Sequence, residues 1–67
     1  MIELTKLNDK KITLNCDLIE IIEETPDTVI TLTTGKKIIV KEGRLFIENL
    51  VKSYRKEIIF DFIKNHL

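Results

Sequence analysis

The sequence predicts an α+β domain, in which a small antiparallel sheet of four or five strands precedes one long C-terminal amphipathic helix. Apolar and polar side chains alternate through much of residues 1–42, as is typical of half-buried strands, and Pro26 and Gly35 mark turns there. Residues 44–66 contain neither Pro nor Gly and have a helical period instead. We therefore assign one domain, residues 1–67, with strands in 1–42 and the helix in 43–67. The pattern does not distinguish an open sheet from a curled or barrel-like one.

Five segments have the length and composition of strands: residues 2–7, 11–15, 18–24, 28–33 and 37–41. For the last hairpin, a three-residue loop with Gly35 in the left-handed conformation places Ile30 and Ile38 on one apolar face, whereas a two-residue loop does not. We therefore favour the three-residue loop. Residues 7–14 also echo residues 32–40, because each stretch reads as a turn, a Lys-Lys pair and a strand.

The helix is expected to carry two apolar faces. At 100° per residue, one stripe, predicted to cover the sheet, contains Ile47, Leu50, Val51, Tyr54, Ile58 and Phe62. A second apolar face appears only towards the end, at Ile59, Phe60, Ile63 and Leu67. A helix of about 23 residues is about 34 Å long, and a strand of six residues only about 20 Å. The last turns should therefore project beyond the sheet and offer a surface for self-association.

Chain length also favours association between copies. A chain of 67 residues with a single cysteine, Cys16, has a small core and no internal disulfide to support it, so a homo-oligomer is expected. The N-terminus lacks the apolar region of a signal peptide, and no apolar run is long enough for a membrane span. These features predict a cytoplasmic protein.

Charge is balanced overall but separated along the chain. Residues 12–35 contain five acids and no Lys or Arg, and basic residues lie on either side. The candidate patch for a partner protein consists of Glu20, Glu23, Glu24 and Asp27. If the two hairpins lie side by side, an alternative nucleic-acid contact consists of Lys10, Lys11, Lys36 and Lys37. The net charge of zero and the lack of stacking aromatics in the strands argue against nucleic acid.

No residue set in the sequence suggests catalysis or metal binding. The spacing of the acids does not match a calcium loop, and Cys16 and His66 have no third partner suited to zinc. Ser53 has no plausible neighbouring base in the sequence pattern. We therefore expect no enzymatic activity, no cofactor and no metal.

One long motif resembles a known family. The run from Asn15 to Lys37 reads N-C-D-L-I-E-I-I-E-E-T-P-D-T-V-I-T-L-T-T-G-K-K, and within residues 1–42 it is similar to the FlbD family of small flagellar and swarming-motility proteins. Cys16 stands where Pro is common in that family, and Gly43 where Ser is common. The resemblance implies a non-enzymatic cytoplasmic factor that supports flagellar assembly or motor performance, peripheral to the flagellar base, by contacting an unidentified flagellar protein.

A second function class remains open. Small curled sheets with one helix, such as Sm-like and related barrels, bind RNA, and the Lys-rich hairpin turns would then be the contact. The alternative is therefore a small nucleic-acid-binding regulator.

Overall fold

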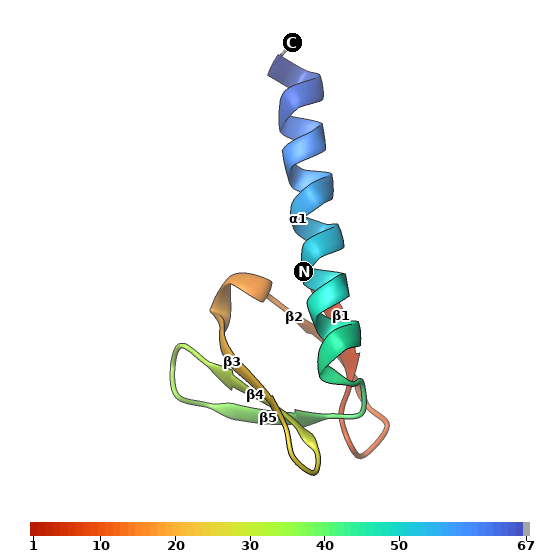
Figure 1. Cartoon of the computed structure of the whole chain (residues 1–67), viewed down its shortest axis with the longest axis vertical. Coiled ribbons are helices and arrows are strands. Elements are labelled where there is room, and N and C mark those ends of the chain that lie inside the picture. The colour runs from red at the N-terminus through yellow and green to blue at the C-terminus, as the bar shows by residue number, and fades with distance from the viewer. Residues whose placement is uncertain (67) are drawn as a thin grey trace.

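A computed structural model of the chain describes the backbone of residues 1–66 and the side chains of residues 1–59, 63 and 64. The elements follow the order β1 (Ile2–Thr5), β2 (Lys11–Leu14), the short 3₁₀ turn η1 (Cys16–Leu18), β3 (Ile19–Glu24), β4 (Thr28–Leu32), β5 (Lys37–Val40) and α1 (Arg44–His66) (Figure 1). The α+β class and the position of the helix are confirmed.

The strands form two antiparallel sheets rather than one. β1 pairs with β2, and β3, β4 and β5 form a separate sheet in that order. The two sheets meet only briefly, where Lys6 bridges Val40 and the Lys41 N–H donates to the Thr5 carbonyl at 2.8 Å. The chain turns away directly after Lys6, so this pairing stops there. The sheets do not close, which decides against the barrel.

The register predicted for the β4–β5 hairpin is confirmed. Ile30 lies opposite Ile38, and residues 33–35 form the three-residue loop. Gly35 has a φ of 89°, and its N–H donates to the Leu32 carbonyl at 2.8 Å. Glycine suits this position because it has no Cβ to clash in the left-handed region.

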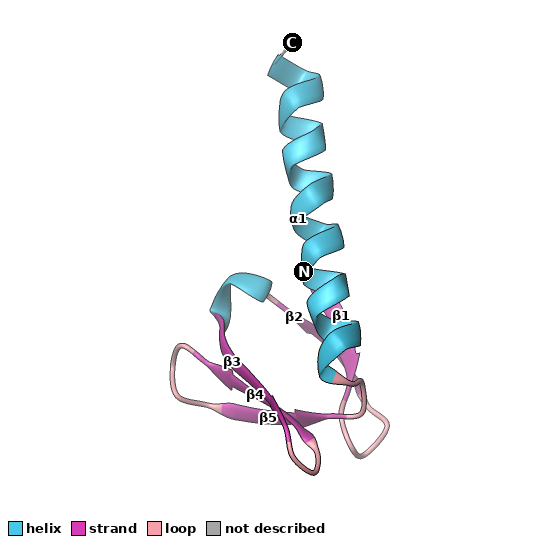
Figure 2. Ribbon diagram, viewed as in Figure 1, coloured by secondary structure: helices cyan, strands magenta, loops and turns pink. Residues whose placement is uncertain are grey.

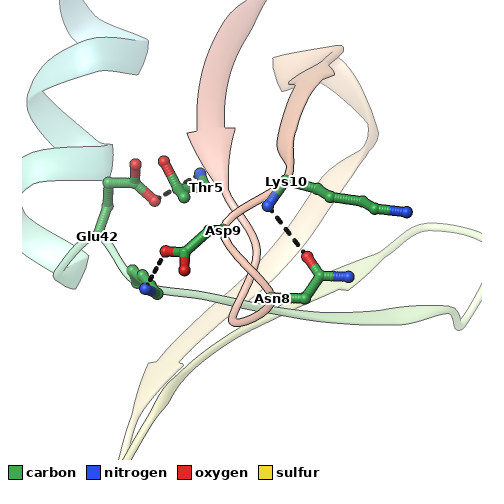
Figure 3. A network of polar contacts seen from close by, with 6 residues as sticks. Thr5, Asn8, Asp9, Lys10 and Glu42 are labelled. Atoms are coloured by element: carbon green, nitrogen blue, oxygen red, sulfur yellow. Dashed lines mark hydrogen bonds and ion pairs between the residues drawn. The ribbon is translucent and has the colours of Figure 1, made fainter.

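The β1–β2 hairpin has the same kind of turn. Asp9 takes the place of Gly35, with a φ of 67°, and its N–H donates to the Lys6 carbonyl at 3.0 Å. The Asp9 carboxylate also pairs with Lys41 (Figure 3). The repeat seen in the sequence is therefore a repeat of turn geometry.

The core lies between the two sheets and the first half of α1. Among the described side chains of α1, Ile47 is fully buried in this core, and the half-buried Leu50, Val51 and Tyr54 pack against the core. The buried apolar residues among the described side chains are Ile2, Leu4, Leu14, Cys16, Ile30, Leu32, Val40 and Ile47. Cys16 is 2% exposed because η1 turns it inward.

The predicted helix stripe leaves the core earlier than expected. Ile58 is 49% exposed, so the part of α1 that covers the sheets ends near Tyr54. The reason is length: α1 continues past the edge of both sheets (Figure 2), and the described chain is 45 Å long but only 22 and 19 Å across. The projection of the helix is confirmed. The last stripe residue, Phe62, has a side chain outside the described set.

Two carboxylates lie close to the start of α1. Ile47 donates its N–H to the Gly43 carbonyl at 3.1 Å, which places Gly43 at the N-cap. Glu24 Oε2, from the end of β3, accepts from the Arg44 N–H at 3.4 Å, and Glu42 Oε1 accepts from the Thr5 N–H at 2.8 Å (Figure 3). Negative charge is favourable at this end of a helix.

Candidate interaction surfaces

The projecting end of α1 exposes apolar side chains. Ile59 is 59% exposed and Ile63 is 47% exposed. They line a shallow, apolar hollow on one side of the helix together with Lys52, Arg55 and Lys56. We call this set the helix-end surface. The other two residues predicted for it lie outside the described residues, since nothing is described of the Phe60 side chain or of Leu67.

The helix-end surface combines apolar side chains with positive charge. Arg55 lies 3.7 Å from Asp17 of η1, a contact between two exposed groups. Lys52 and Lys56 take part in none of the ion pairs found among the described side chains. A partner that covers this surface should therefore be apolar at its centre and tolerate or neutralise the two lysines.

The four predicted acids are exposed, but they do not share one face. Glu23 lies opposite Val29, which lies opposite Ile39, so these three occupy the outer face of the β3–β4–β5 sheet. Glu24 lies opposite the buried Thr28 and reaches the start of α1.

The turn that follows β3 brings three of these acids to one end of the molecule. We call Glu23, Glu24 and Asp27 the acidic turn, because they flank residues 25 and 26 between β3 and β4. Glu20 lies further along β3, towards the opposite end of the strand pair. Across the part of the chain that the structure describes, no three His, Cys, Asp or Glu side chains gather as a metal site would require.

The four predicted lysines do not form one patch either. Lys36 and Lys37 line a groove of about 600 Å³ between the two sheets, and Lys6 lines it with them. Lys11 instead lies 3.2 Å from Glu3 on β1, and Lys10 is outside the groove lining. The apolar lining includes Leu7, Ile12, Leu14, Leu32 and Ile38. We call this feature the lysine-rimmed groove.

Sequence reasoning missed several residues of these surfaces. Lys6 joins Lys36 and Lys37 only because the two hairpins pack against each other. At the first turn of α1, Leu45 is 67% exposed and Phe46 is 55% exposed, next to the Glu24 contact. Two adjacent large apolar residues outside the core stripe were the available signal in the sequence.

Glu42 has a lowered pKa. Partial burial opposes its ionisation, but hydrogen bonds from the backbone and side chain of Thr5, its own backbone N–H and the positive charge of Lys11 outweigh this effect. The ionised carboxylate therefore holds β1 against the segment that leads into α1 (Figure 3).

The fold and these surfaces define a small α+β domain with open sheets and a projecting helix. The sequence model of the FlbD family, described as flagellar and swarming motility proteins, matches residues 1–59, and the chain belongs to this family. The match runs past residue 42, where the motif resemblance ends, so it includes α1 as far as Ile59. No curated protein and no solved structure matches the chain.

The described part of α1 contains no stretch long and apolar enough to cross a membrane.

Proposed function

We propose that this member of the FlbD family supports flagellum-driven motility as a non-enzymatic, cytoplasmic interaction protein. Its surfaces would act in flagellar assembly or in motor performance at the flagellar base. The family match carries the link to motility. The observation that supports an interaction role is the helix-end surface, where Ile59 and Ile63 remain exposed on a helix that has left its own core.

We propose that a second copy of the chain covers the helix-end surface. Exposed apolar side chains at successive turns of one helix can pair with the same stripe of another copy, as in a short coiled coil. The small core adds a reason. Burial of this surface between copies would stabilise a chain in which few of the described side chains are buried. The acidic turn would then be the surface for a flagellar partner.

The test combines motility with solution mass. Ile59→Gln with Ile63→Gln removes the apolar side chains while keeping good helix formers. In a strain that lacks the chromosomal copy, this variant should restore less swarming than the wild-type chain, and purified it should have the lower mass. Ile58→Gln is the matched control, since Ile58 is 49% exposed but lies outside the helix-end surface. Full swarming by the double variant, together with an unchanged mass, would reject the helix-end surface.

The nucleic-acid alternative has less support. The described strands carry no aromatic side chain on which a base could stack, and Lys11 is engaged by Glu3. Its test is binding of a single-stranded RNA across a salt series. Steeply salt-dependent binding that is lost in Lys36→Glu would favour this alternative.

A further inference from the structure

Two surfaces of opposite charge, the acidic turn and the lysine-rimmed groove, lie at different places on this molecule. Glu23 and Asp27 of the acidic turn take part in none of the ion pairs between described side chains, and neither do Lys36 and Lys37 of the lysine-rimmed groove. The net charge of the chain is zero, so the charges are separated rather than in excess. Proteins with no net charge and complementary patches associate readily.

The two surfaces cannot neutralise each other within one copy. β4, Thr28–Leu32, separates them, with the acidic turn before its first residue and the Lys36 turn after its last. Five residues of strand span about 15 Å. This exceeds the screening length of about 8 Å at physiological salt, and neither kind of side chain bridges it. A protein group that neutralises either surface would therefore come from a second molecule.

Both surfaces also have exposed apolar side chains beside their charges. The groove has an apolar lining, in which Leu7 is 50% exposed and Ile38 is half-buried. The acidic turn lies beside the first turn of α1, where Glu24 meets the Arg44 N–H and the exposed Leu45 and Phe46 follow. Arg44 adds a positive charge at this end, but Glu48 lies 3.8 Å from it. An apolar centre with a charged rim is the common anatomy of a protein interface.

We propose that the acidic turn of one copy docks into the lysine-rimmed groove of a second copy, head to tail. This inference rests on the proposed interaction role and deepens it by naming a partner for the acidic turn. This contact is separate from the helix-end surface, because neither the acidic turn nor the groove contains a residue of that surface. A head-to-tail contact extends a chain of copies or closes a ring, and in an open chain one acidic turn stays free for another protein.

The experiment isolates this contact in the Ile59→Gln, Ile63→Gln background, where the helix-end surface is disabled. Mass is measured by light scattering up to about 1 mM, the range of weak contacts. The background protein should associate at low salt and dissociate as salt rises. Adding Lys36→Glu with Lys37→Glu, or Glu23→Lys with Asp27→Lys, should give monomers. All four charge changes in one chain should restore association, because the two surfaces are then complementary again.

Net charge is controlled separately. Lys36→Gln and Lys37→Gln remove two positive charges from the groove, and Glu57→Lys restores a net charge of zero at an exposed helix position outside both surfaces. This control should remain monomeric, because its groove no longer attracts the acidic turn. A background protein that is monomeric at every concentration overturns the proposal, as does equal association of the four-change variant and this control. Both results concern only proteins in which the helix-end surface is disabled. Self-association through that surface is tested separately, by comparing the wild-type chain with the background protein.

Discussion

Glu42 accepts a hydrogen bond from the backbone N–H of Thr5, with 2.8 Å between Oε1 and the nitrogen, and so joins β1 to the start of α1 across 37 residues of chain. The contact lies beside the bridge where the two sheets meet. This side chain therefore links β1 to the segment between β5 and α1, in addition to the backbone contacts at the same junction.

Glu42→Ala is expected to lower the free energy of unfolding by about 1 kcal/mol, the usual net value of one intramolecular hydrogen bond to a partly exposed group. Urea unfolding followed by circular dichroism measures this change. Glu57→Ala is the control, because Glu57 is exposed on α1 and takes part in none of the side-chain hydrogen bonds or ion pairs among the described residues. If both variants lose the same stability, Glu42 has no special role at the junction.

The stability provided by Glu42 should depend on pH. Its pKa in the folded state lies below the ordinary value of 4.5, so the folded protein favours the ionised carboxylate. The contribution is therefore complete above pH 4.5 and is lost as the pH falls through the lowered folded value. The difference in stability between wild type and Glu42→Gln should be largest near neutral pH and shrink in acid. A difference that stays constant would mean that ionisation of Glu42 does not matter.

Substitution of Gly35 tests the geometry of the turn between β4 and β5. A Cβ at this position would meet no atom within 4 Å, so the effect of a substitution comes from the φ of 89° alone. Gly35→Ala should cost about 1–2 kcal/mol of unfolding free energy, and Gly35→Asn should cost less because Asn tolerates the left-handed region. Thr33→Ala, at an exposed position in the same loop, is the control. Equal losses in Gly35→Ala and Gly35→Asn would argue against a left-handed Gly35.

Substitution of Ile47 and of Ile58 tests the position at which α1 leaves the core. Ile47 is 0% exposed and Ile58 is 49% exposed, although both belong to the same predicted stripe. Ile47→Val should lower the unfolding free energy by about 1 kcal/mol, whereas Ile58→Val should change it by less than about 0.5 kcal/mol. Chemical denaturation of the two variants gives the comparison. A loss at Ile58 as large as that at Ile47 would place the core boundary further along α1.

Local chemistry made much of the fold predictable. The β4–β5 register follows from one glycine and the alternation around Ile30 and Ile38, all within a few residues. The helix boundary follows from the absence of Pro and Gly in residues 44–66. The structure agrees at both places.

Features that depend on packing between distant segments were not predictable. Lys6 reaches the groove of Lys36 and Lys37 only through the arrangement of two hairpins. Glu24 was assigned to a partner patch, but its carboxylate lies at the start of α1, 20 residues later in the chain. Periodicity reports which face a residue occupies, but it does not report where the neighbouring element ends. For this reason the predicted stripe, which runs to Phe62, includes Ile58, although Ile58 is 49% exposed.

We propose that this FlbD-family chain acts through contacts between copies, with the helix-end surface as the first of them. The most direct test is the solution mass of the wild-type chain by light scattering over a concentration series, compared with the Ile59→Gln, Ile63→Gln variant. We predict a multimer for the wild type, and a lower mass for the variant at every concentration at which the wild type is associated. A wild-type chain that stays monomeric throughout, or a variant whose mass curve coincides with that of the wild type, would contradict the claim.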